Sequence, residues 1–218
     1  MKKLAILFLL FVFNLTHANE NWYLEGGVGY YKTDKYSTEP YQGAGLNLTD
    51  IFSHDSSFGG GLEFGYSGIM DTNFRTSISY FIGVSKIKEP PGQTQDGVKV
   101  DMQGFVGNNK SKIHYSMLNL FYDFKNTSSF TPFLGAGVGL ADAKDFDENG
   151  ATDKEFAWAG YIGINYHIKE NLYIGLKGSH YQINELVSKK YRDSGANHDY
   201  KAENIKSNAI TATLGYEF

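Results

Sequence analysis

The sequence contains no cysteine, no apolar run long enough to span a membrane as a helix, and no excess of basic residues. Without cysteine, neither a disulfide framework nor a thiol-based site is available. The absence of a basic stripe excludes nucleic acid as a partner. The longest apolar run, residues 4–13, is too short to cross a bilayer as a helix. If the chain lies in a membrane, it must do so as a closed barrel, because only helices and closed barrels satisfy every backbone group in lipid.

The first residues have the composition of a secretory signal peptide. Lys2 and Lys3 precede the apolar run, and Ala18 follows it as a small residue suited to cleavage. We therefore expect a signal peptide at residues 1–18 and one mature domain at residues 19–218. Cleavage removes two of the 20 Lys+Arg and none of the 24 Asp+Glu, so 18 basic residues face 24 acidic ones and the formal charge is −6. The mature chain is acidic.

From residue 21 onward, apolar and polar residues alternate in eight segments. Alternation with period two is typical of strands with one apolar and one polar face. The predicted strands are residues 21–31, 57–67, 73–86, 111–124, 130–143, 154–168, 172–186 and 205–218. Three short connections (68–72, 125–129 and 169–171) alternate with four long polar ones (32–56, 87–110, 144–153 and 187–204). The pattern predicts an all-β fold, an eight-stranded antiparallel transmembrane β-barrel with up-and-down order.

Aromatic residues gather at the strand ends next to the short connections. Such a belt is expected where rings bury their bodies in acyl chains and their polar edges meet headgroups. Its predicted members are Trp22, Tyr66, Phe74, Tyr122, Phe124, Phe130, Tyr166, Tyr216 and Phe218. The alternative is the core of a soluble, lipocalin-like barrel.

Three segments resemble a known family, the eight-stranded outer-membrane barrels that include the OmpA transmembrane domain and the opacity-type surface proteins. They are WYLEGGVGY at 22–30, TPFLGAGVGL at 131–140 and TLGYEF at 213–218. The resemblance implies a bacterial outer-membrane protein surrounded by lipid and lipopolysaccharide. It also implies that Tyr216 and Phe218 act as the signal by which the outer-membrane assembly machinery, a transient partner, recognises the chain. In such barrels short turns face the periplasm and long loops face outside, so both termini would be periplasmic.

The inward face of the predicted barrel carries charges of both signs. An eight-stranded barrel is just wide enough to be filled by side chains, so these groups must pair or hold water. Glu63 and Arg75 lie across a short turn and are placed to meet diagonally. We expect a lumen charge network of Glu25, Glu63, Arg75, Asp123, Lys177 and Glu217. A working ion path is the alternative.

Two motifs suggest ligands and then depart from the pattern. Residues 145–150, DFDENG, match the opening of a calcium loop, but Phe156 occupies the position of the closing glutamate and Glu155 comes one residue early. An Asp/Asn/Gly hairpin tip explains the same residues. The glycines of 135–139 lack the helix that a nucleotide loop needs immediately after them. We predict no metal and no cofactor, and calcium binding by Asp145 to Asn149 stays open.

A catalytic interpretation begins from His114 and Ser116, which share one strand face in a His-x-Ser pattern. A serine nucleophile needs a base oriented by a third group, and the sequence suggests no acidic partner at the depth of His114. We therefore predict a non-enzymatic surface protein whose barrel anchors four polar extracellular loops for surface interaction and envelope structure. A narrow porin-like channel is the first alternative, and a lipid A-modifying enzyme is the second.

Overall fold

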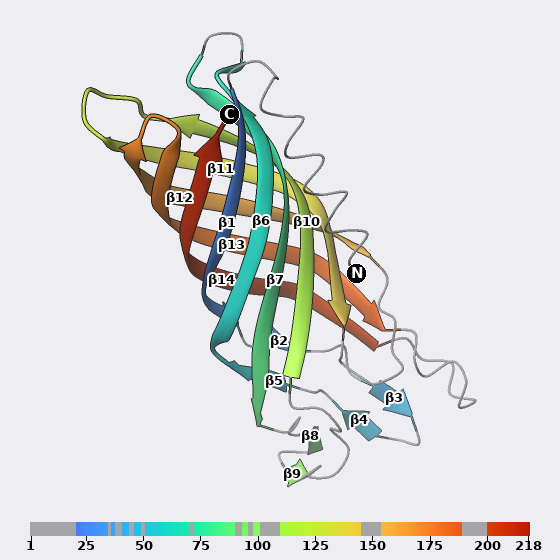
Figure 1. The fold of residues 1–218 in the computed structure, drawn as a ribbon. Helices are drawn as coiled ribbons and strands as arrows, with labels where there is room; N and C mark the ends of the chain where they lie inside the picture. Colours follow the sequence, from blue (N-terminus) through green and yellow to red (C-terminus); the bar gives the residue numbers. More distant parts are fainter. Residues whose placement is uncertain are drawn as a thin grey trace, which may run out of the picture.

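The computed structural model describes residues 21–34, 36–37, 41–43, 46–48, 51–69, 72–89, 93–95, 98–100, 110–144, 154–188 and 200–218. Among these residues eight long strands form a closed barrel (Figure 1): β1 (Trp22–Thr33), β6 (Ser57–Ser67), β7 (Phe74–Glu89), β10 (Lys110–Asp123), β11 (Phe130–Lys144), β12 (Glu155–Lys169), β13 (Leu172–Ser188) and β14 (Tyr200–Glu217). Each pairs antiparallel with the next in this order, including β7 with β10. The pairing of the last strand, β14, with the first, β1, closes the cylinder. The predicted fold is confirmed. Within the same ranges, no helix has the length and apolar character to span a membrane.

The long connections contain short strands that the sequence analysis did not predict. They are β2 (Tyr36–Ser37), β3 (Tyr41–Gly43), β4 (Leu46–Leu48), β5 (Ile51–Asp55), β8 (Gln93–Gln95) and β9 (Val98–Val100). β5 pairs with β7 and with β2, so the barrel wall continues past β6. Two to five residues are too few for a period-two pattern to be recognised. Figure 1 shows β3, β4, β8 and β9 at the end of the barrel opposite to the C-terminus.

The long strands lie close to their predicted spans, with the main differences at the ends next to the long connections. β14 begins at Tyr200 rather than at Ile205, and β13 continues to Ser188. There the β13–β14 backbone ladder continues through the pairs Glu185–Glu203 and Val187–Lys201. Pairing of this kind does not require apolar side chains, so the alternation ends before the strands do.

The short connections fix the register between neighbouring strands. Gly68, between β6 and β7, has φ of 70°, which glycine adopts without steric cost. Between β10 and β11, the Ser128 N–H donates to Asn126 Oδ1 (2.8 Å) and Asn126 Nδ2 donates to the Phe130 carbonyl (2.8 Å). β12 and β13 are joined by residues 170–171. Because side chains alternate between the two faces, these turns decide which residues enter the lumen.

The outer face is apolar and the inner face is packed. Val28, Phe58 and Ile78 point outward and are 70%, 76% and 68% exposed. A wall of this kind is stable against lipid. The predicted aromatic belt forms adjacent ring pairs at the end of the short connections: Trp22–Tyr66 (5.2 Å between centroids), Phe74–Tyr122 (5.2 Å), Tyr122–Phe124 (5.1 Å), Phe130–Tyr166 (4.8 Å) and Tyr216–Phe218 (5.2 Å).

Candidate functional site

The central feature of the lumen is a cluster of ion pairs contributed by five strands. Lys177 of β13 places its Nζ 2.5 Å from Glu25 Oε1 of β1 and 2.9 Å from Glu63 Oε2 of β6. Arg75 of β7 makes a two-point contact with Asp123 of β10, with Nε 3.2 Å from Oδ2 and Nη2 3.3 Å from Oδ1. Arg75 Nη1 also lies 3.7 Å from Glu63 Oε1. Glu63 therefore joins the two cations into one network.

The burial of these groups makes the pairing essential. Glu25, Glu63 and Arg75 are 2%, 4% and 4% exposed. Removing one partner from such a cluster leaves a charge without water or a counter-ion, which is strongly destabilising. Three carboxylates share two cations here, so the cluster depends on further hydrogen-bond donors.

Two tyrosines supply those donors. Tyr23 Oη donates to Glu63 Oε1 at 2.7 Å, and Tyr173 Oη donates to Glu25 Oε2 at 3.0 Å. The guanidinium of Arg75 also lies over an aromatic face, 4.5 Å from the centroid of Phe121. The sequence analysis did not include Tyr23, Tyr173 or Phe121 in the network. Their inward position in the alternation was visible, but which strand they would face across the lumen was not.

The structure brings together five of the six residues that we assigned to the network. The sixth, Glu217, is the last residue of β14, half-buried and opposite Tyr23 in the register. The ion pairs of the cluster do not include it. Its backbone N–H donates to the Asn171 carbonyl at 2.9 Å, so its described contact is with the short connection.

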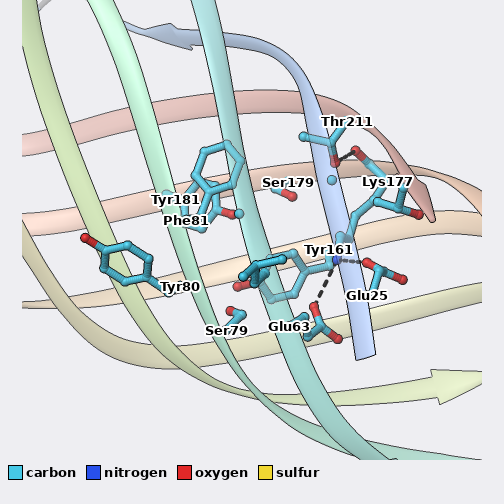
Figure 2. Close-up of a pocket in the computed structure, with 14 residues that line it drawn as sticks. Glu25, Glu63, Ser79, Tyr80, Phe81, Tyr161, Lys177, Ser179, Tyr181 and Thr211 are labelled. Atoms are coloured by element: carbon cyan, nitrogen blue, oxygen red, sulfur yellow. Dashed lines mark hydrogen bonds and ion pairs between the residues drawn. The ribbon is translucent and has the colours of Figure 1, made fainter. Parts of the chain in front are cut away.

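A small cavity lies beside the cluster. It measures about 30 Å³, which is room for roughly two water molecules. Figure 2 shows its labelled lining residues, with Lys177 bonded to both glutamates and Thr211 bonded to the Lys177 carbonyl. Inward-facing residues that line it are Glu25, Glu63, Ser79, Phe81, Tyr161, Lys177, Ser179, Tyr181, Thr211 and Thr213. Its lining mixes aromatic rings with the charged groups of Glu25, Glu63 and Lys177, which are able to hydrogen-bond water.

A second layer, toward the long connections, closes the lumen with aromatic rings. Tyr115 and Tyr181 stack at 4.3 Å between centroids, and Phe81 stacks on Tyr181 at 5.6 Å. The hydroxyls of Tyr31 and Tyr115 each donate to Ser207 Oγ, at 2.9 and 3.1 Å. We call Tyr31, Phe81, Tyr115 and Tyr181 the aromatic layer. All four are buried.

His114 and Ser116, which form the His-x-Ser pattern, lie on the outer face of the barrel. The register between β10 and β11 places Asp142 directly opposite His114. Our interpretation that no acidic residue lies at the depth of His114 is therefore wrong. The turn at 124–129 sets this register, and the alternation within each strand does not reveal it. His114 Nδ1 is bonded to the hydroxyl of Tyr80 at 2.5 Å.

Possible metal ligands are sparse in the described part of the chain. No group of three or more His, Cys, Asp or Glu side chains there is placed to hold a metal ion. The calcium-like segment from Asp145 to Asn149 lies outside the described residues, as does the expected signal peptide at 1–18.

Comparison with known proteins identifies relatives across the whole barrel. The sequence profile of the family "Outer membrane protein beta-barrel domain" matches residues 4–218. Outer membrane protein PagN of Salmonella typhimurium (strain LT2) is 26% identical, over 87% of this chain and 89% of its own length. The crystal structure of OprG from Pseudomonas aeruginosa has a TM-score of 0.61 at 16% identity, covering 93% of this chain and 98% of that one. Neisserial surface protein A has a TM-score of 0.57 at 15% identity, covering 90% and 97%. At these identities the two structural likenesses concern the fold.

Proposed function

Because this chain belongs to the outer membrane protein β-barrel family, we propose that it is a surface protein, a non-enzymatic, non-conducting anchor that holds its long connections outside the cell. Both termini then lie in the periplasm, and the outer-membrane assembly machinery is a transient partner. Recognition usually resides in long loops held by a rigid scaffold, so the long connections are the proposed contact surface.

The lumen is closed at two levels, and this observation favours an anchor over a channel. The ion-pair cluster occupies one level and the aromatic layer occupies the next. A permeating ion would have to displace Lys177 or Arg75 from buried carboxylates and then pass the stacked Tyr115 and Tyr181. A cavity with room for about two waters is not a continuous path.

The orientation is supported by the arrangement of the connections. The short turns lie at the same end as the C-terminus, and the short strands β3, β4, β8 and β9, which belong to the first two long connections, lie at the other end (Figure 1). Outer-membrane barrels place short turns in the periplasm and long loops outside. The aromatic belt at the short-turn end then marks the periplasmic interface.

The absence of cysteine allows a direct test of orientation. Ser56 is the last residue of the long connection at 32–56 and Ser128 lies in the short connection at 125–129, and both are exposed. In intact cells a membrane-impermeant maleimide should label Ser56→Cys and leave Ser128→Cys unlabelled until the outer membrane is permeabilised. The reverse pattern would contradict the proposed orientation.

Planar-bilayer recordings of the refolded protein should show no discrete conductance steps, and regular steps would instead favour the channel.

A lipid-modifying enzyme is the second candidate, favoured by the placement of Asp142 opposite His114 two residues from Ser116 on the outward face. The Tyr80 contact at Nδ1 weakens this candidate because it already engages one nitrogen of the imidazole. Mass spectrometry of lipid A should show the same acyl pattern in cells carrying the wild-type protein and in cells carrying Ser116→Ala. A change in the acyl pattern that depends on Ser116 would contradict the proposed anchor and support the lipid-modifying enzyme.

A further inference from the structure

Two buried polar side chains flank Gly175 on the inner wall of the barrel. Gly175 of β13 pairs with Asn165 of β12 on one side and with Thr213 of β14 on the other. A Cβ built on Gly175 would lie 2.5 Å from both Asn165 Oδ1 and Thr213 Oγ1, so the two oxygens are separated by no more than twice that distance. The lack of a side chain at Gly175 brings both oxygens to one small space.

One of these oxygens lacks a hydrogen-bond partner. Asn165 is 6% exposed, and no donor among the described residues is bonded to its Oδ1. A buried carboxamide oxygen gives up the hydrogen bonds that it makes in water, so it requires a compensating partner inside the protein. An oxygen of this kind in a native structure indicates a bound water or ion.

The carboxylate of Glu25 is held next to the same space. Tyr173 and Lys177 stand two residues before and two residues after Gly175, so all three face the lumen from β13. Tyr173 Oη donates to Glu25 Oε2, and Lys177 Nζ donates to Glu25 Oε1, the contact drawn as a dashed line in Figure 2. Glu25 and Thr213 also line the small cavity beside the ion-pair cluster. Carboxylate, hydroxyl and carboxamide oxygens from β1, β14 and β12 therefore converge here.

The ion-pair cluster at this level has one negative charge in excess. Its two cations, Arg75 and Lys177, face three carboxylates, those of Glu25, Glu63 and Asp123. The tyrosine hydroxyls donate hydrogen bonds to the carboxylates but bring no charge. An unbalanced charge in a buried site is costly unless an opposite charge compensates it. A water molecule in the cavity would satisfy an orphan oxygen and leave the excess charge, whereas a cation would do both.

We propose that the lumen binds one monovalent inorganic cation, such as sodium, between Asn165 Oδ1, Thr213 Oγ1 and the carboxylate of Glu25. Hard cations take oxygen ligands, and protein oxygens replace their hydration shell. The Ile164 carbonyl oxygen, 3.3 Å from the Cβ position of Gly175, is a further oxygen at this place. The neighbouring cavity of about 30 Å³ has room for a water molecule on the ion. One positive charge balances the cluster, and a divalent ion would reverse its sign.

The test compares the full mature chain, refolded in an uncharged detergent, in sodium chloride and in choline chloride at the same ionic strength. Choline screens charge as sodium does but is too large for a cavity with room for about two waters. Heat-modifiable migration measures the ratio of folded to unfolded protein at a fixed urea concentration. The ratio should rise about tenfold in sodium, as linkage requires when the ion is present at about ten times its dissociation constant. If a proton or a water molecule occupies the site instead, the wild type is equally stable in the two salts.

Three variants assign the sodium effect to this site. Thr213→Val keeps the shape of the side chain and removes one oxygen ligand, so the sodium effect should fall below about twofold. Glu25→Gln removes the excess charge and should abolish the effect in the same way. Thr127→Val is the matched control, because Thr127 is exposed in a short connection, and it should keep the full effect. A sodium effect of equal size in Thr213→Val and Thr127→Val would overturn the inference.

A direct measurement on the wild type does not depend on the folding of any variant. In crystals grown with thallium(I) in place of sodium, anomalous scattering should give a peak beside Asn165 and Thr213. Equal stability of the wild type in sodium and choline, or a thallium map without this peak, contradicts the proposed site. Ion binding in detergent is the same whichever end of the barrel faces outward, so these results leave the orientation to the cysteine labelling of Ser56 and Ser128.

Discussion

Glu25 of β1 and Glu63 of β6 lie directly opposite each other in one antiparallel register, with both carboxylates buried. Like charges in such positions repel and destabilise a strand pair. Lys177 contacts both, although it lies 152 and 114 residues further along the chain. The two glutamates of the β1–β6 strand pair therefore gain their shared cation only after β13 has joined the barrel. The cluster links local strand pairing to closure of the whole cylinder.

Lys177→Met should destabilise the barrel strongly. The substitution keeps most of the side-chain volume and removes the cation, so two buried carboxylates lose their shared partner. Breaking a buried pair in this way costs about 3–5 kcal/mol. Urea unfolding in detergent micelles, followed by heat-modifiable migration, measures the change.

Lys169→Met serves as the control because Lys169 is exposed at the end of β12. It should leave the unfolding midpoint unchanged. Adding Glu25→Gln to Lys177→Met should recover part of the loss, since Glu25 pairs with Lys177 whereas Glu63 keeps its contact with Arg75. A Lys177→Met protein as stable as the wild type would show that the cluster is not essential to the fold.

Gly83→Ala should disturb the aromatic layer. A Cβ at this position would lie 2.2 Å from Cζ of the Tyr31 ring, whose hydroxyl is bonded to Ser207. Overpacking of this kind costs roughly 1–3 kcal/mol. Gly160→Ala is the matched control, because a Cβ at Gly160 meets nothing within 4 Å. The unfolding midpoint of the first variant should fall and that of the second should not. Equal midpoints would mean that Tyr31 moves aside at no cost.

The strand spans, the facing of each residue and the aromatic belt were predictable from the sequence because each depends on one strand and its period-two pattern. Glu63 and Arg75 were also predicted to meet, since a single short turn joins their strands. They do so at 3.7 Å.

Relationships between distant strands were not predictable in the same way. Alternation places Lys177 and Tyr173 inside the barrel but does not say which carboxylates they face, because that depends on the register and stagger of all eight strands. The position of Asp142 opposite His114 was not predicted for the same reason. The short strands β2 to β5 are held by pairing with neighbours rather than by a pattern of their own.

Phe218→Ala should reduce assembly in cells while leaving the folded barrel nearly as stable as before. Phe218 contacts Tyr216 at the belt, with ring centroids 5.2 Å apart, and its N–H donates to the Trp22 carbonyl at 2.8 Å. The backbone bond survives the substitution, so refolding in detergent should proceed to the same yield as for Phe124→Ala, which removes another exposed belt ring. If the C-terminal aromatic is the signal read by the assembly machinery, only Phe218→Ala should lower the heat-modifiable fraction in isolated outer membranes, by several-fold. An equal reduction for the two variants would assign the effect to loss of a belt ring in general and would remove the assembly role of Phe218.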